Sequence, residues 1–333
     1  MINQKKPLFQ KFFARLFFKK AASPRTIAPR APAPRTNELR GNLILCLTAF
    51  IWGTAFVAQA MGMELVGPFT FNSIRSVIGG LALLACVFLF DRIGVSKKPA
   101  SRAEYIFLAK SGLTCGLILF VASSLQQLGI KYSTAGKAGF LTALYIIIIP
   151  VIGIFMKKRA SANIWGAVAV ALAGMYFLCV KETFKPTPGD VLLIGCAFCY
   201  SLHIIAIDYF APRTDCVRMS CIQLLVSGAI GLVFMFIFEE PTLASIYDAR
   251  LSILYAGLLS SAAAYTLQIV AQRDTKPVMA SLIMSLESVF AVLAGWVVLN
   301  EVLTLKELFG CALILVAIIW AQIPKKGRKT QAE

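Results

Sequence analysis

Charged residues, and acidic residues above all, are scarce in this sequence. Only 15% of its 333 residues are charged, and 16 acidic residues stand against 33 lysines and arginines. A typical soluble domain has about 25% charged residues, and a soluble protein of this length could not cover its surface with so few. Apolar residues make up 58% of the chain, which predicts a polytopic membrane protein.

Motifs of energy-coupled enzymes and of metal sites are also missing. The sequence has one histidine and no P-loop, HExxH or phosphotransfer motif, which argues against ATP-driven pumping and against a membrane-embedded enzyme. Nine cysteines lie almost entirely inside apolar stretches, and their odd number argues against a disulfide framework. Cys196 and Cys199 have the spacing of a metal or redox motif, but small apolar helix residues are the simpler interpretation. We therefore expect no metal, no cofactor and no catalytic residue.

Residues 1–40 differ from the rest of the chain, because they hold ten lysines and arginines, one acid and a segment rich in proline, alanine and arginine. Such a composition cannot form a packed core. The stretch 7–20 is basic and aromatic, and it can lie as an amphipathic helix on the anionic inner leaflet of the lipid bilayer. An organellar transit peptide is the alternative, whereas the lack of an uninterrupted apolar region argues against a secretory signal peptide.

From residue 41 onward, apolar blocks alternate with short polar breaks. The blocks are about 20 residues long, the length that an α-helix needs to cross the hydrocarbon core, and this excludes a β-barrel. Pro150 predicts a kink in the fourth block. The ten blocks are 41–63, 69–90, 105–128, 136–156, 161–180, 189–210, 216–238, 251–272, 278–299 and 305–323.

The basic residues follow the topology of these spans. With ten spans both termini lie on one side, and placing them in the cytoplasm puts 25 of the 33 basic residues on that side and 6 outside, while Arg75 and Lys110 lie within spans. This distribution follows the positive-inside rule. The net charge of +17 therefore indicates orientation and not a nucleic-acid partner. We expect both termini in the cytoplasm and the protein in the cell (inner or plasma) membrane.

The second half of the chain repeats the first. A shift of 148 residues places Trp52 of span 1 on Tyr200 of span 6. A shift near 142 places Ala138 of span 4 on Ala280 of span 9. Because each repeat has five spans, an odd number, the second copy is inverted in the membrane. Inverted repeats are a transporter architecture, with the substrate site near the midplane where the repeats meet.

Four motifs in the outermost spans point to a known family. They are Ile51-Trp-Gly-Thr-Ala-Phe56, Gly67-Pro-Phe-Thr-Phe-Asn-Ser-Ile-Arg75, Ser285-Leu-Glu-Ser-Val-Phe-Ala291 and Leu299-Asn-Glu-Val-Leu-Thr304. The sequence resembles the EamA-type drug/metabolite transporter superfamily over about 41–323. The resemblance implies an all-α polytopic membrane protein with ten transmembrane helices as two inverted five-helix repeats, a central cavity, and transport of amino acids, nucleobases, sugars or drugs.

The resemblance also divides the chain and shows where it departs from the family. It implies a first repeat at 41–180 and a second at 188–323. The charge distribution adds basic cytoplasmic tails at 1–40 and 324–333. Many relatives have proline where Ser288 follows Glu287. They often have Gly-Glu where this chain has Lys-Lys-Arg at 157–159, so a role for Glu301 by symmetry is doubtful.

Two charged residues within the spans are candidates for transport, because charges at membrane depth are costly and usually face protein or water. Glu287 lies close to the middle of span 9 and can carry a proton as the coupling group. Arg75 can pair with Glu287 or bind a substrate carboxylate. The alternative for both is a fixed ion pair or a helix-end contact that holds the bundle together.

Uncharged polar and aromatic side chains at membrane depth complete the candidate site. His203, the only histidine, can relay protons or bridge two helices. Trp52 and Tyr200 can stack a planar substrate or form a gate, and simple packing is the alternative. The full set of candidates for substrate binding or coupling is Glu287, Arg75, Trp52, Gln59, Asn72, Tyr145, Tyr200, His203, Tyr265, Gln268 and Ser285.

These features predict a secondary transporter, a permease or exporter, that moves a small metabolite or drug-like molecule by alternating access. Proton coupling through Glu287 is one form of this mechanism. A passive channel or pore is the alternative, and a membrane-embedded enzyme lacks a reactive cluster. The expected partners are a small-molecule substrate and the lipid bilayer, and the sequence is compatible with a homodimer.

Overall fold

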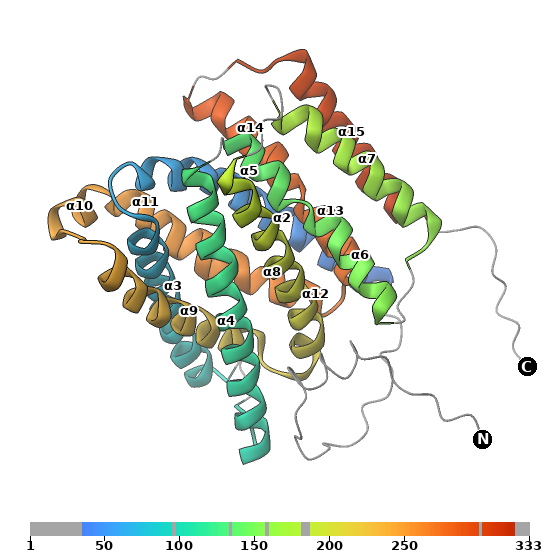
Figure 1. The fold of residues 1–333 in the computed structure, drawn as a ribbon. Coiled ribbons are helices and arrows are strands. Elements are labelled where there is room, and N and C mark those ends of the chain that lie inside the picture. Colours follow the sequence, from blue (N-terminus) through green and yellow to red (C-terminus); the bar gives the residue numbers. More distant parts are fainter. Residues whose placement is uncertain are drawn as a thin grey trace, which may run out of the picture.

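The structure is a computed structural model, and it describes residues 35–94, 98–132, 135–156, 160–180, 187–299 and 302–323. Within these residues every regular element is a helix, and the helices form one bundle (Figure 1). The stretch 7–20, the motif at 157–159, Glu301 and the tail 324–333 lie outside the described residues.

All ten predicted spans are present in the described part of the chain. Each is long and apolar enough to cross a membrane, which confirms the predicted all-α fold. The first five spans are α2 (Arg35–Met63), α3 (Pro68–Arg92), α4 (Arg102–Lys131), α5 (Ala135–Thr142) with α6 (Tyr145–Phe155), and α7 (Ala162–Cys179). The second five are α8 (Pro188–Phe210), α9 (Cys216–Phe238), α11 (Arg250–Tyr255) with η2 (Ala256–Ala264) and α12 (Tyr265–Gln272), α13 (Pro277–Met284) with α14 (Leu286–Leu299), and α15 (Leu305–Gln322). The short elements η1 (Ala211–Arg213) and α10 (Leu243–Asp248) lie in connections.

Helix starts follow signals in the sequence. Prolines open α3, α8 and α13, where the missing N–H costs no intrahelical hydrogen bond. Thr304 and Glu307 form a capping box at the start of α15. The first helix of the described residues, α2, begins at Arg35, before the predicted start at residue 41. The apolar pattern marks only the part of a helix that lies in lipid, so it misses this polar first turn.

Reciprocal glycine contacts relate the two repeats. A Cβ atom at Gly80 of α3 would lie 2.6 Å from the Leu225 side chain of α9, and one at Gly228 of α9 would lie 2.8 Å from the Val77 side chain of α3. The shift of 148 residues converts Gly80 into Gly228 and Val77 into Leu225. The two contacts are therefore one contact repeated by a pseudo-two-fold relation.

An acidic side chain closes each end of the same α3–α9 pair. Asp91, in the last turn of α3, forms an ion pair with Arg218 in the first turn of α9. Glu239, just after α9, accepts hydrogen bonds from the backbone N–H groups of Phe69 and Thr70, both at 2.8 Å. The shift of 148 converts Asp91 into Glu239 and Thr70 into Arg218. A basic side chain at one end thus corresponds to the partly positive N-terminus of a helix at the other.

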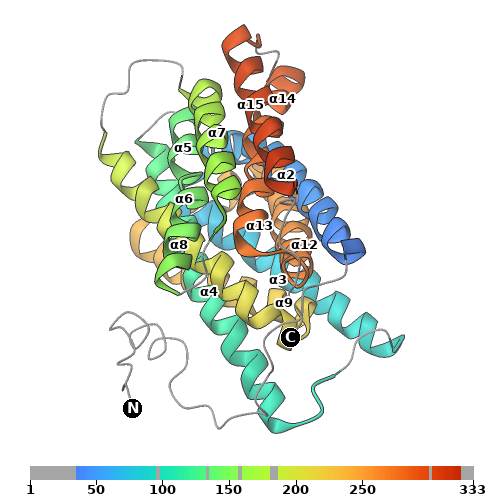
Figure 2. The same cartoon turned by 90° about the vertical axis from the view of Figure 1, so that its right-hand side faces the viewer.

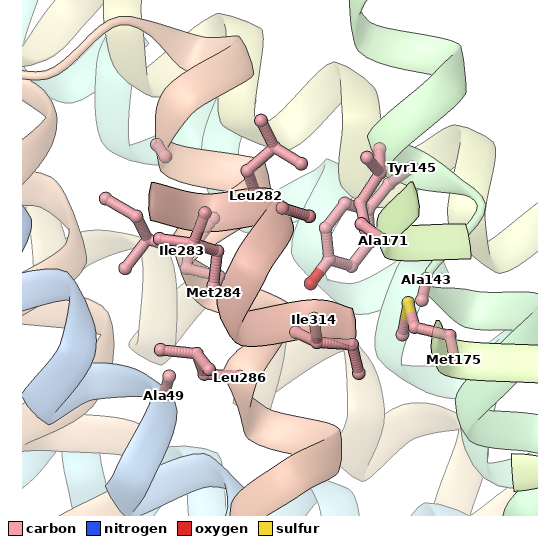
Figure 3. Packing of buried hydrophobic residues seen from close by; sticks show 14 of the residues in the cluster. Ala49, Ala143, Tyr145, Ala171, Met175, Leu282, Ile283, Met284, Leu286 and Ile314 are labelled. Atoms are coloured by element: carbon pink, nitrogen blue, oxygen red, sulfur yellow. The ribbon is translucent and has the colours of Figure 1, made fainter. Parts of the chain in front are cut away.

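Spans 4 and 9 are both interrupted near their middles. Between α5 and α6 the helix is broken at Ala143 and Leu144, and α13 ends at Met284, two residues before α14 begins. The shift of 142 places Thr142 on Met284, so the two interruptions are equivalent. The sequence predicts a kink at Pro150, but this break lies earlier in the span, and Pro150 lies inside α6. A large apolar cluster from α2, α6, α7, α13, α14 and α15 packs around both breaks (Figure 3).

Span 8 contains the π-helical segment η2, whereas the equivalent span 3 is the continuous α-helix α4. Gly116 of α4 and Gly257 of η2 make equivalent contacts with α9 and α3 at a shift of 141 residues. Beyond η2, Gly129 and Ala271 are related by 142, since both approach the start of the first helix of the opposite repeat. The π-helix thus accommodates one additional residue, and such insertions are frequent at functional sites.

Two helix pairs stand at opposite ends of the bundle, α3 with α9 and α7 with α15 (Figures 1 and 2). The α7–α15 pair crosses at two glycines. A Cβ atom at Gly174 would lie 2.8 Å from the Gly310 carbonyl oxygen, and one at Gly310 would lie 2.6 Å from the Gly174 carbonyl oxygen. Backbones approach this closely only without side chains, as is common where helices pack in membranes.

The substitution Gly174→Ala is expected to destabilise the protein, because the added methyl group must push α15 away. Overpacking of this kind costs about 1–3 kcal/mol. The midpoint of thermal unfolding of the purified protein in detergent measures the effect. Gly195→Ala on α8 is the matched control, since its Cβ atom would meet its nearest neighbour at an ordinary 3.5 Å. Equal midpoints for the two variants would contradict the close crossing.

Candidate substrate-binding cavity

A cavity lies between the two repeats and has a volume of about 50 Å³. Engineered cavities that bind benzene are about 150 Å³ in size, so a metabolite enters only after the surrounding helices separate. Helices of both repeats contribute to the walls, as the inverted-repeat architecture requires. The lining residues are Trp52, Phe56, Gln59, Arg75, Gln126, Thr142, Tyr145, Tyr200, His203, Ile204, Ser260, Tyr265, Gln268, Met284 and Glu287.

Arg75 of α3 faces this cavity and is held by amide oxygens. Its Nε and Nη2 atoms donate to Asn72 Oδ1 at 2.9 and 2.7 Å, and its Nη1 atom donates to Gln59 Oε1 at 3.4 Å. Asn72 donates in turn to the Ser123 hydroxyl at 2.7 Å, and Gln127 donates to Gln59 Oε1 at 2.8 Å. These bonds fix the guanidinium group in position, and Arg75 as a whole is only 4% exposed.

Glu287 of α14 is the acidic side chain of the cavity wall. It accepts a hydrogen bond from the Tyr145 hydroxyl of α6 at 3.2 Å. The shift of 142 converts Tyr145 into Glu287, so equivalent positions, each just after the break in its span, meet across the interface of the repeats. Figure 3 shows the Tyr145 ring directed from α6 towards the α13–α14 break, beside Met284. Within the described residues, Arg75 and Glu287 form no ion pair with each other or with another side chain.

Aromatic residues form a second part of the wall. The Trp52 indole donates to the Ser260 carbonyl oxygen of η2 at 3.0 Å, and its ring meets Tyr265 at a centroid distance of 5.0 Å. Tyr200, the repeat equivalent of Trp52, donates to Gln126 Oε1 at 3.2 Å. The equivalent donors thus reach opposite spans, Trp52 to span 8 and Tyr200 to span 3. The π-helix provides a backbone acceptor where α4 provides a side chain.

His203 of α8 lies on the same wall and bridges to α9. Its Nε2 atom lies 3.2 Å from Gln223 Oε1, so the imidazole and the amide side chain form a hydrogen bond between α8 and α9. Gln223 is the repeat equivalent of Arg75. In the described part of the chain, the buried atoms His203 Nδ1 and Gln268 Oε1 have no hydrogen-bond partner. Buried polar atoms of this kind are normally satisfied by water or a ligand.

The structure brings most of the predicted candidates together and separates two from the cavity. Glu287, Arg75, Trp52, Gln59, Tyr145, Tyr200, His203, Tyr265 and Gln268 all line it. Asn72 lies behind Arg75 and orients it. Ser285 donates to the Leu282 carbonyl oxygen at 2.6 Å, at the break between α13 and α14, so its hydroxyl is used within its own span.

Sequence reasoning missed the less polar members of the wall. Phe56 and Ile204 are related by the shift of 148, and Thr142 and Met284 by the shift of 142, so each pair lines the cavity from both repeats. The repeat shifts convert no candidate into any of these four residues; applied to Gln268, the shift of 142 gives only Gln126, which also lines the cavity. Ser260 contributes through the segment η2, whose π-helical form no sequence pattern marks.

Comparison with known proteins identifies the family. The model of the EamA-like transporter family matches residues 39–180 and 187–322, one match for each repeat. This chain belongs to the EamA-like transporter family. The two matches confirm the resemblance that the motifs of the outermost spans indicate.

Known EamA relatives extend over most of the chain. An uncharacterized transporter of Archaeoglobus fulgidus is 29% identical over 288 residues, 85% of each chain. The uncharacterized transporter YoaV of Bacillus subtilis is 24% identical over 286 residues, covering 84% of this chain and 95% of its own. The chloroplastic WAT1-related protein At3g02690 of Arabidopsis thaliana is 21% identical over 297 residues, with 85% of this chain and 69% of its own covered.

A solved structure shares the fold. It superimposes with a TM-score of 0.70 at 18% sequence identity, over 87% of this chain and 97% of the other. The described bundle is therefore a known arrangement of helices. The family match and the ten apolar helices show that this protein is an integral membrane protein of the transporter type.

The substitution Trp52→Phe is expected to lower stability by about 1 kcal/mol, because it removes the indole hydrogen bond to the Ser260 carbonyl oxygen of η2. Thermal unfolding in detergent measures this loss. Trp296→Phe is the matched control, because Trp296 is exposed on the outside of the bundle and does not line the cavity. A midpoint for Trp52→Phe equal to that of the control would show that the indole bond to η2 does not stabilise the fold.

Proposed function

We propose that this protein is a secondary transporter that carries a small molecule through the central cavity by alternating access, with Glu287 as the group that couples transport to protons. The contact between Tyr145 and Glu287 carries the proposal. These two positions are equivalent in the inverted repeats, follow equivalent helix breaks, and meet at the cavity.

The helix breaks support movement at this contact. At each break the regular hydrogen-bond pattern is interrupted by an i→i−3 bond, from Ile146 N–H to the Ala143 carbonyl oxygen and from Ser288 N–H to the Ser285 carbonyl oxygen. A half-helix can bend at such a point without disrupting the rest of its span. The cavity is too small for a metabolite in the described conformation. Loading therefore requires that the walls separate, and the breaks beside Thr142 and Met284 provide the places where they can do so.

Glu287 is suited to couple this movement to protons. It is a carboxyl group at membrane depth whose described hydrogen-bond partner is a neutral hydroxyl, so binding a proton removes the cost of an unpaired charge. When Glu287 loses that proton, its carboxylate favours hydrogen-bond donors as neighbours more strongly than the neutral carboxyl group does. Proton binding and the arrangement of α6 and α14 are then linked through one hydrogen bond.

The substitution Glu287→Gln is expected to abolish accumulation driven by a pH gradient while leaving exchange intact. Glutamine keeps the hydrogen bond with Tyr145 but cannot release a proton. Proteoliposomes are loaded with labelled organic acids, amines and neutral metabolites in turn, and both uphill uptake and counterflow are measured. Glu64→Gln is the control, since Glu64 is an exposed acid.

Three outcomes of this assay bear on the proposal. Saturable counterflow with any compound supports a carrier. Downhill flux without counterflow would favour the channel alternative. Counterflow together with normal uphill uptake by Glu287→Gln would remove this residue from the coupling mechanism.

We further infer that both termini face the cytoplasm, because 25 of the 33 basic residues then lie on that side. A C-terminal green fluorescent protein fusion is expected to fluoresce in a bacterial host, and a C-terminal alkaline phosphatase fusion is expected to be inactive. Phosphatase fusions placed after span 1 or span 3 should be active and serve as controls. An active C-terminal phosphatase would reverse the orientation.

A further inference from the structure

We propose that the cargo is a small planar monocarboxylate, bound by Arg75 and moved together with one proton on Glu287, so that each transport step is electrically neutral. The proposal rests on the function proposed above and adds the chemical class of the substrate. It follows from the hydrogen bonds of Arg75, from the charges facing the cavity, and from the aromatic wall.

Arg75 has N–H donors that its described hydrogen bonds do not use. A guanidinium group has five N–H donors, and three of them are used by Asn72 and Gln59. One N–H remains on each of the two terminal nitrogens. A carboxylate accepts such a pair in a bidentate arrangement, which is the strongest common mode of anion recognition by arginine. The amide oxygens of Asn72 and Gln59 prevent the group from turning away from the cavity.

The positive charge of Arg75 has no fixed counter-ion in the described part of the chain. Its hydrogen-bond partners are all neutral, and no acidic side chain lies within 4 Å of it there. An unpaired charge buried at membrane depth is costly, and buried charges are normally paired. An anionic ligand would supply that pair each time the site is loaded.

Charge balance favours a monoanion over other classes of cargo. The empty cavity is neutral overall when Arg75 is positive and Glu287 is ionised. A bound monocarboxylate keeps it neutral only if Glu287 takes up one proton. A cation exchanged against a proton would leave the cavity positive in both states, and a zwitterion would leave it neutral without any proton. Only the monoanion makes the proton on Glu287 a requirement of loading.

Apart from Arg75 of α3, which lies across the cavity, the groups that face Glu287 carry no permanent charge. They are Tyr145 of α6, Cys179 of α7, Cys196 and His203 of α8, and Tyr265 of α12. In the described part of the chain His203 has the Gln223 amide as its hydrogen-bond partner and forms no ion pair, so no carboxylate there stabilises a charged ring. Arg75 is therefore the permanent charge of this site.

The aromatic wall sets the shape of the cargo. Trp52 and Tyr265 lie edge to face at 5.0 Å, and Tyr200 and Tyr145 lie on the same cavity. Aromatic side chains favour flat partners through offset stacking and edge contacts. A single ring that bears one carboxylate combines both features, with the ring against Trp52 or Tyr265 and the carboxylate on Arg75.

Binding is tested with three one-ring probes of nearly equal size: benzoate, its neutral amide benzamide, and benzylamine. Quenching of tryptophan fluorescence and thermal shift of the purified full-length protein report binding. Benzoate is expected to bind roughly tenfold or more tightly than the other two, the value of a charged hydrogen bond. Equal or tighter binding of benzamide, benzylamine or the zwitterion phenylglycine would overturn the proposal.

Two variants locate the anion site. Arg75→Gln removes the charge, and Asn72→Asp places a fixed carboxylate beside the guanidinium group, where it competes with the ligand. Both are expected to lose roughly tenfold or more in benzoate affinity, and Asn72→Asp should do so without loss of thermal stability because it completes an ion pair. Arg250→Gln, outside the cavity, should bind benzoate as the unmodified protein does. Unchanged benzoate binding by a stable Asn72→Asp protein would refute the role of Arg75.

Transport tests the neutral step separately. Benzoate uptake in excess of that by protein-free liposomes, which neutral benzoic acid crosses unaided, is expected to follow an inward proton gradient, to be lost with Arg75→Gln, and to be unaffected by a membrane potential set with potassium and valinomycin. Uptake that responds to the potential would overturn the neutral stoichiometry. If an amine or sugar shows counterflow and benzoate does not bind, the proposed substrate class is wrong, whereas the proposed carrier function is supported. If benzoate binds but no compound shows counterflow, the proposed carrier function is wrong, whereas the proposed anion site is supported.

Discussion

A charge inside the hydrocarbon layer must be offset by groups placed beside it, and the cavity of this protein depends on that constraint. Asn72 and Gln59 direct amide oxygens at Arg75, while Gln127 and Ser123 fix these amides from behind. Amide oxygens accept three of the five N–H donors of the guanidinium group without cancelling its charge. The network therefore makes a buried cation tolerable and still leaves it able to attract an anion.

The inverted repeat determines how these groups come to face one another. Equivalent glycines let α3 approach α9, and Gly174 and Gly310 let α7 approach α15, at the two ends of the bundle. Between these close crossings lie the broken spans 4 and 9, whose ends meet through Tyr145 and Glu287. The helix pairs at the ends of the bundle are tightly packed. The interrupted helices lie between them, so the helix breaks are next to the cavity.

The sequence predicts the spans well because lipid imposes one length on every apolar block. It predicts the contact of Tyr145 with Glu287 only indirectly, since the shift that aligns Ala138 with Ala280 also aligns these two. It cannot tell that Asn72 supports the site from behind, because polarity at membrane depth does not say which neighbour a side chain meets. It gives no sign of η2 either. A π-helix arises from the fit of one extra residue between packed neighbours, so the acceptor at Ser260 is visible only in three dimensions.

The positions where the repeats differ are as informative as those where they agree. Arg75 corresponds to Gln223 and Glu287 corresponds to Tyr145, so each repeat contributes one charged group and faces a neutral equivalent in the other. Two identical halves would exchange conformations with no change in free energy. Here, the exchange would move a guanidinium group and a carboxyl group between unlike surroundings, so binding an ion at either one shifts the balance between the two conformations. The repeat symmetry thus keeps the free-energy difference between the two conformations small. Because the symmetry is broken at the pairs Arg75/Gln223 and Glu287/Tyr145, binding of a ligand or a proton there determines which conformation is favoured.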